Sequence, residues 1–200
     1  MSQVIAFRPL VSLAMPESRA ARLVTQAFLV LAGTLLLVIS AKTKVVLGPV
    51  DLSLQTLAVL LVGACFGMRL GLATLLLYLA EGAMGFPVFQ STPEKGLGLA
   101  YMAGPTGGYL VGFAVMAAIA GYAADRGWDR NVVKLFGAML VAEVAMLGLG
   151  FAWLSVLIGV DGAWTFGVLP FILPDLIKVA LAACLVPAGW SALRGLGLLR

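Results

Sequence analysis

Long runs of apolar residues, separated by short polar interruptions, dominate the chain. Six runs stand out, at residues 23–41, 52–68, 70–84, 105–124, 135–159 and 169–192. A helix needs ~20 mostly apolar residues to cross ~30 Å of hydrocarbon. The second run is short, and Arg69 marks a tight turn between it and the third. The pattern predicts an all-α membrane protein whose residues 23–193 form six transmembrane helices.

The polar stretches predict the parts outside the membrane. Residues 1–22 predict a short cytoplasmic lead at the membrane surface, and because no small-residue cleavage site follows an apolar run, we expect no signal peptide. Gly and Pro in residues 45–51 predict a loop that enters the membrane edge. Residues 85–103 form the longest polar interruption and predict an external loop that covers a site. Residues 194–200 predict a cytoplasmic tail.

Basic residues indicate which way the chain is inserted. With both termini in the cytoplasm, the inner side holds Arg8, Arg19, Arg22, Arg69, Arg126, Arg130, Lys134, Arg194 and Arg200. The outer side holds Lys42, Lys44 and Lys95. Because cytoplasmic loops carry an excess of Lys and Arg, this asymmetry favours six crossings with both termini inside.

Composition supports the membrane assignment and excludes several functions. Hydrophobic residues make up 62% of the 200 residues and charged residues 11%, too little polar surface for a soluble domain of this size. The chain has no histidine and no P-loop, which argues against an enzyme, a metal site or direct ATP binding. The net charge of +4 suits basic cytoplasmic loops beside a lipid bilayer, so we expect no nucleic-acid partner.

Two opposite charges lie in the last apolar run, where charge is costly. Asp175 and Lys178 are three residues apart, so they share one face of a helix. Pro174 suits the first turn of a helix, which would put Asp175 near the positive end of the dipole. Two interpretations remain open: an ion pair that only fixes the segment, or the floor of a site for a small polar molecule.

The predicted topology gathers further polar and aromatic residues at the outer side. Gln55 and Thr56 begin the second segment, Glu81 ends the third, Tyr109 begins the fourth and Trp153 approaches the end of the fifth. Each alone has a simpler explanation, as a helix cap or an interfacial aromatic. Together, below a long loop, they indicate a site that captures a solute from outside.

Several motifs resemble those of the BioY biotin transporter family. The resemblance rests on Gly104-Pro105-Thr106-Gly107-Gly108-Tyr109, on Gln55-Thr56-Leu57-Ala58, on Glu81-Gly82-Ala83-Met84-Gly85-Phe86-Pro87, and on Leu169-Pro170-Phe171 with Asp175 and Lys178. It covers about residues 25–190. Gly104, Gly108 and Gly112 also recur every fourth residue, a spacing typical of close helix packing.

The resemblance implies the S-component fold of an energy-coupling factor (ECF) transporter in the cell (inner) membrane. It implies biotin uptake, with capture at the outer face, no cofactor in this chain, and ATP hydrolysis by partner ATPases joined through a transmembrane coupling protein. The substrate-binding residues it suggests are Gln55, Thr56, Glu81, Phe89, Gly107, Gly108, Tyr109, Trp153, Asp175 and Lys178.

Three alternatives differ in substrate or energy source. A carrier of the same architecture for thiamine or riboflavin is disfavoured by the Gly104–Tyr109 motif. A membrane-embedded enzyme using Glu81 or Glu143 with Asp175 lacks histidine and a nucleophile pair. A stand-alone, ion-coupled transporter would use one of these carboxyl groups as its proton carrier.

Overall fold

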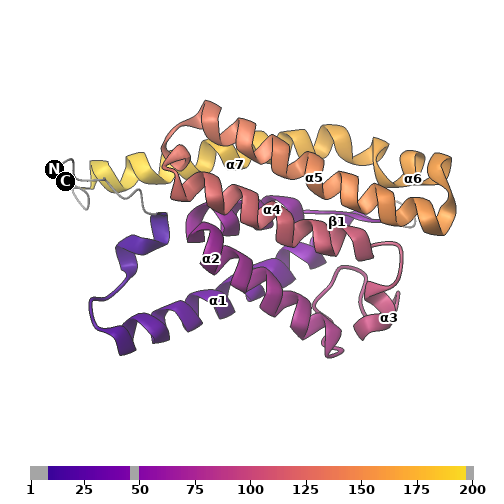
Figure 1. The fold of residues 1–200 in the computed structure, drawn as a ribbon, viewed down its shortest axis with the longest axis horizontal. Helices are drawn as coiled ribbons and strands as arrows, with labels where there is room; N and C mark the ends of the chain where they lie inside the picture. The colour runs from indigo at the N-terminus through magenta and orange to yellow at the C-terminus, as the bar shows by residue number, and fades with distance from the viewer. Residues whose placement is uncertain (1–8, 46–49, 197–200) are drawn as a thin grey trace.

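The computed structural model describes residues 9–45 and 50–196, and these residues are mostly helical (Figure 1). The elements are η1 (Leu10–Ala14), α1 (Arg19–Lys42), β1 (Lys44–Val45), β2 (Leu52–Ser53), α2 (Gln55–Ala83), α3 (Gly98–Met102), α4 (Gly107–Asp125), η2 (Trp128–Arg130), α5 (Val132–Ile158), α6 (Val160–Gly167) and α7 (Leu169–Gly195). The two short strands pair antiparallel, with Lys44 opposite Ser53.

Five helical stretches in the described residues are long and apolar enough to cross a membrane: α1, α2, α4, α5 and the run through α6 and α7. One of them, α2, is broken at Gly67 and turns back on itself. The side-chain amide of Gln55 donates to the Tyr78 hydroxyl at 2.9 Å. On a straight helix these residues would lie ~34 Å apart at ~1.5 Å per residue. The described residues therefore contain six apolar helical segments, two of which are the halves of α2.

Glycine makes the reversal in α2 possible. Gly67 has φ +79° and ψ 172°, a conformation that side chains other than glycine rarely adopt. The next amide, Met68 N–H, donates to Asp125 Oδ2 at the end of α4, at 3.1 Å. A Cβ on Gly71 would lie 3.1 Å from Gly63 Cα, so the two halves of α2 pack with their backbones close together.

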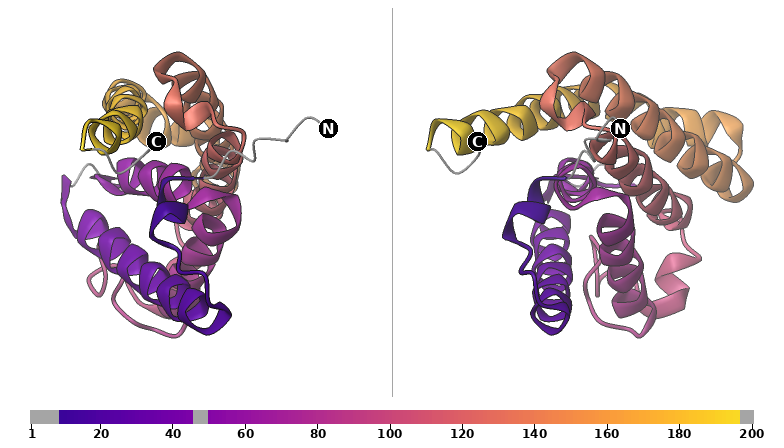
Figure 2. Two further views of the ribbon diagram at one scale, coloured as in Figure 1. Left: turned by 90° about the vertical axis from the view of Figure 1, so that its left-hand side faces the viewer. Right: turned by 60° about the vertical axis from the view of Figure 1, so that its left-hand side comes forward.

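The first and last described elements of the chain lie at the same end of the bundle. η1 and the end of α7 lie at the left of Figure 1, whereas α3 and α6 lie at the right. We call these the inner and outer ends, following the distribution of basic residues. α2 packs against α4, and α4 packs against α5. These three helices form the centre of the bundle. α1 packs mainly along α2 at the edge of the bundle (Figure 2).

Several boundaries differ from those predicted. α1 starts at Arg19, inside the expected lead, because Ser18 Oγ accepts the Ala21 N–H and caps the helix. The expected loop 85–103 contains the short helix α3. α7 begins at Leu169, with Pro170 in its first turn, so Pro174 lies within the helix and Asp175 on its second turn. The placement of Pro174 in the first turn was therefore wrong. Parts of the predicted lead, edge loop and tail (1–8, 46–49 and 197–200) fall outside the described residues.

Candidate ligand-binding site

A cavity opens at the outer end, between the centre of the bundle and the loops that follow α1 and α2. The space that water-sized molecules can occupy in it is about 30 Å³, whereas all the space between its atoms, open solvent included, is about 420 Å³. Loop residues, the starts of α2 and α4, and inward faces of α5 and α7 contribute to its wall. The lining residues are Val50, Asp51, Ser53, Gln55, Thr56, Gln90, Tyr101, Thr106, Tyr109, Leu110, Phe113, Met146, Phe171, Asp175 and Lys178.

The buried ion pair of α7 forms one side of this cavity. Lys178 Nζ donates to Asp175 Oδ1 at 2.6 Å and to the carbonyl oxygen of Ser53, also at 2.6 Å. Asp175 is 1% exposed and Lys178 8% exposed. Asp175 Oδ2 is buried and has no hydrogen-bond partner among the described residues. Because a buried carboxylate oxygen without a donor is costly, this atom is the strongest candidate to accept a hydrogen bond from a ligand.

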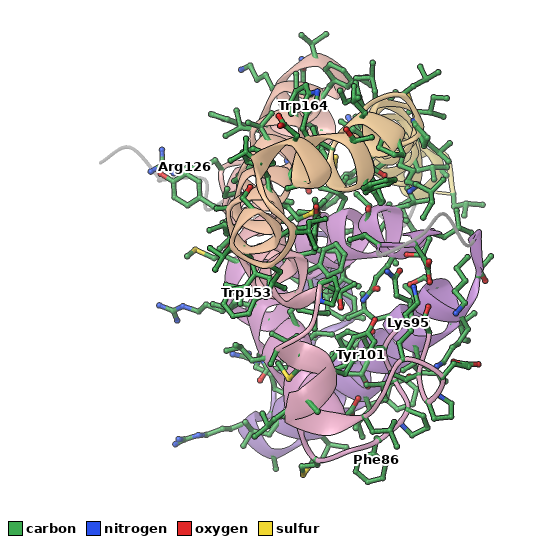
Figure 3. All side chains as sticks on the ribbon, turned by 90° about the vertical axis from the view of Figure 1, so that its right-hand side faces the viewer. Phe86, Lys95, Tyr101, Arg126, Trp153 and Trp164 are labelled. Carbon is green, nitrogen blue, oxygen red and sulfur yellow. The ribbon has the colours of Figure 1, made fainter. Side chains whose placement is uncertain are left out.

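Aromatic rings form much of the remaining wall. The Tyr109 hydroxyl donates to the Gly167 carbonyl oxygen at 2.8 Å, which ties α4 to the end of α6. Its ring lies 6.3 Å from that of Phe171, centroid to centroid. Tyr101 enters from α3 (Figure 3) and donates to the Gln90 carbonyl oxygen at 2.6 Å. These rings give the cavity an apolar body beside its charged pair.

Burial keeps the hydroxyl of Tyr101 neutral. Burial raises the pKa of Tyr101 to about 12, and a hydrogen bond with Thr106 opposes part of that rise. A phenol with a raised pKa stays protonated, and therefore neutral, to higher pH. Tyr101 therefore remains a hydrogen-bond donor across the physiological range.

Charged residues fasten the covering loops to each other. Lys95 Nζ lies 3.1 Å from Asp51 Oδ1, and the Ser91 hydroxyl donates to the same carboxylate. Lys44 Nζ donates to Ser91 Oγ at 2.7 Å. Figure 3 shows Lys95 at the right of this end of the molecule, close to Tyr101. The loop after α1 and the loop after α2 are thus joined over the cavity.

Lys42, at the end of α1, holds the second loop from the side. Its ammonium donates to the carbonyl oxygens of Phe89 and Thr92 at 2.8 and 2.7 Å, and to Thr92 Oγ1 at 2.9 Å. Lys42 thus ties the loop at residues 85–103 to the end of α1, and Gln90 and Tyr101 of this loop line the cavity.

Of the ten residues predicted to bind substrate, five line the cavity: Gln55, Thr56, Tyr109, Asp175 and Lys178. The structure places the others outside its lining. A Cβ on Gly107 would lie 2.1 Å from the Met102 carbonyl oxygen, and one on Gly108 2.4 Å from Trp153 Cβ. These glycines give room for neighbouring backbone and side chains.

Three predicted residues support the cavity from behind or lie away from it. Phe89 stacks on Tyr101, with ring centroids 5.3 Å apart, and is 1% exposed. Trp153 is 41% exposed, and its indole N–H donates to the Gly104 carbonyl oxygen at 2.9 Å. Glu81 lines a separate hollow, formed with Val38 and the residues 86–88.

The sequence interpretation did not identify the loop residues of the cavity. Asp51, Ser53 and Gln90 lie in segments without periodicity, so nothing in the pattern assigned them to a wall. Tyr101 comes from α3, which the polar composition of its loop concealed. Thr106 and Phe171 lie within the motifs that resemble the BioY family, and this position could have identified them as cavity residues.

Replacing Trp153 with Phe is expected to leave ligand affinity within about twofold, because its side chain lies outside the cavity wall. The variant should lose stability by about 1 kcal/mol, the net value of a typical hydrogen bond. Equilibrium binding and thermal unfolding of the purified protein measure the two effects. An affinity loss of tenfold or more would place Trp153 in contact with the ligand instead.

A second hollow opens at the inner end, between η1, α1 and the bend in α2. Its wall includes Glu17, Arg22 and Arg69, and all three are exposed to solvent. Charges that water already solvates contribute little to binding, whereas those in the outer cavity are buried. The outer cavity is therefore the better candidate for selective binding of a small molecule.

The fold and the cavity are those of a multi-pass membrane protein with a candidate site for a small molecule near one end. The model of the BioY family matches residues 13–195, and the chain belongs to the BioY family. Membership places it among transport proteins rather than enzymes.

Curated relatives and one solved structure agree with this assignment. The probable biotin transporter BioY of Pyrococcus horikoshii is 38% identical over 144 residues, which cover 72% of this chain and 83% of the relative. The biotin transporter BioY of Thermotoga maritima is 36% identical over 156 residues, 75% of this chain and 86% of the relative. The crystal structure of the S-component for biotin from an ECF-type ABC transporter matches with a TM-score of 0.73 at 20% identity, over 86% of this chain and 94% of that chain, and supports the fold.

Proposed function

We propose that this chain takes up biotin by capturing it in the outer cavity and delivering it across the cytoplasmic membrane. The observation that carries the proposal is the buried pair of Asp175 and Lys178, with an unpartnered carboxylate oxygen, beside an aromatic wall. Named relatives of this family are biotin transporters, which identifies the ligand class to test first.

The chemistry of biotin suits the two halves of the cavity. Its ureido ring offers two N–H donors and one carbonyl acceptor, and its sulfur ring is apolar. In the proposal, Asp175 Oδ2 accepts a ureido N–H, while Tyr109, Phe113 and Phe171 enclose the apolar ring. Charge-assisted hydrogen bonds contribute ~1.5–3 kcal/mol each, so a few of them with an enclosed ring account for nanomolar binding at ~−12 kcal/mol.

Lys178 is the second polar contact in the proposal. An ammonium has three N–H donors, and two of those of Lys178 go to Asp175 and Ser53. The third serves either the ureido oxygen or the valerate carboxylate of biotin. Titration with biotin amide, which lacks the carboxylate, separates these choices: unchanged affinity assigns the ureido oxygen.

Energy for release comes, in this proposal, from partner subunits. Membership of a transporter family whose fold matches an ECF S-component supports two ATPases coupled through a transmembrane protein. The chain itself contains no P-loop. The alternative is transport by this chain alone, driven by an ion gradient.

Uptake of labelled biotin tests the proposal and separates the two energy sources. The host is a cell without other biotin transporters, expressing this chain with or without the partner ATPases. We expect uptake that requires the ATPases and is competed by unlabelled biotin but not by thiamine or riboflavin. Uptake that persists without ATPases and collapses with the proton gradient supports the ion-coupled alternative, and no uptake in either cell contradicts the proposed function.

A further inference from the structure

Glu143, in the middle of α5, is a buried carboxyl group that the proposed site does not use. It is 4% exposed, and no N–H or O–H group of the described residues donates to either of its oxygens. It lies one turn before Met146, which lines the cavity. A buried carboxylate without hydrogen-bond donors is too costly to persist, so such a group is neutralised by binding a proton.

The groups that act on Glu143 lie on α7. The carboxyl group of Asp175 lies within hydrogen-bonding reach of it, and the ammonium of Lys178 is close enough to interact with it. Of the other ionisable groups on the elements packed against α5, Tyr109 donates to Gly167 and Asp129 accepts from Trp190. The rest are exposed: Tyr122, Asp125, Arg130, Asp161, Cys184 and Arg194. The local arrangement is therefore two carboxyl groups and one ammonium.

We propose that Glu143 is protonated and donates a hydrogen bond to the Asp175 carboxylate, which positions that carboxylate for the ligand. With Glu143 neutral, the three groups sum to zero charge, whereas an ionised Glu143 would leave a net negative charge in a buried site. Lys178 occupies Asp175 Oδ1. A carboxylate has about four lone-pair sites, so Oδ2 has room for Glu143 and for one ligand N–H.

Glu143 is thus a positioning residue, and this role rests on the proposed binding of biotin at Asp175. Removing the donor should free the Asp175 carboxylate to rotate and should weaken ligand binding. It should not unfold the protein, because Asp175 keeps Lys178 as its partner and leucine adds no polar group to the buried site. Weaker binding with undiminished stability is a combination that a merely structural residue would not give.

Biotin titration of purified Glu143→Gln and Glu143→Leu variants tests this inference. Gln retains an N–H donor and should bind within about twofold of the wild type, whereas Leu should bind at least about fivefold more weakly, as loss of ~1 kcal/mol predicts.

Each other outcome overturns the inference. Equal affinity of all three proteins at neutral pH removes Glu143 from the positioning of Asp175. If the wild type does not bind biotin, the proposed function itself has failed; if it binds and Glu143→Leu binds equally well, only this inference has failed.

Discussion

Biotin binding is expected to weaken about 10- to 150-fold when Asp175 is replaced with Asn, because one charge-assisted hydrogen bond of ~1.5–3 kcal/mol is lost. The substitution preserves shape but removes the negative charge. The remaining amide offers a weaker acceptor to a ureido N–H, and it no longer neutralises Lys178, 2.6 Å away. Lys178→Ala should weaken binding at least about tenfold for the complementary reason.

Asp161→Asn is the matched control, since Asp161 is exposed on α6 and lies outside the cavity lining. Its affinity should equal that of the wild type. Calorimetric titration of biotin measures all three variants, and thermal unfolding verifies that each is folded. Wild-type affinity in folded Asp175→Asn and Lys178→Ala would remove this pair from the site.

Substituting Gly108 with Ala is expected to separate α4 from α5 and to lower the free energy of unfolding by about 1–3 kcal/mol, the usual cost of overpacking. The added Cβ would lie 2.4 Å from Trp153 Cβ and 2.5 Å from the Leu149 carbonyl oxygen. The backbone oxygen has little freedom to move, so the helices must shift. Tyr109 is the next residue, so biotin affinity should fall as well.

Gly148→Ala supplies the control for this prediction, because a Cβ at Gly148 on α5 would meet nothing within 4 Å. It should unfold at the same temperature as the wild type or slightly above, since Ala is the better helix former. Thermal unfolding in detergent measures both variants. If Gly108→Ala is as stable as Gly148→Ala, then Gly108 is not needed for close packing, and its glycine would need a different explanation.

Hydrophobic periodicity and charge were sufficient to predict the six apolar segments. Arg69 marked the turn between the second and third segments, and Gly67, two residues earlier, provides the reversal. The placement of Asp175 and Lys178 on one helix face followed from their spacing, and their contact confirms it. Local signals of this kind are strong because each depends on residues close in sequence.

The covering loops and the second carboxyl group required the structure. The contacts that hold the loops join residues more than 40 positions apart in the sequence: Lys42 with Phe89, and Lys95 with Asp51. No local sequence pattern indicates such contacts. Glu143 is in the first half of α5 and Asp175 is near the start of α7, 32 positions later, yet their carboxyl groups interact. The depth of a residue along one helix does not determine which residue of another helix it contacts.

The most direct test of the account is a structure of this chain with biotin bound. We predict biotin in the outer cavity, with a ureido nitrogen within ~3.2 Å of Asp175 Oδ2, as a hydrogen bond requires, and its apolar ring between Tyr109 and Phe171. Biotin bound instead in the hollow at the inner end, or with no polar contact to Asp175 or Lys178, would contradict the account.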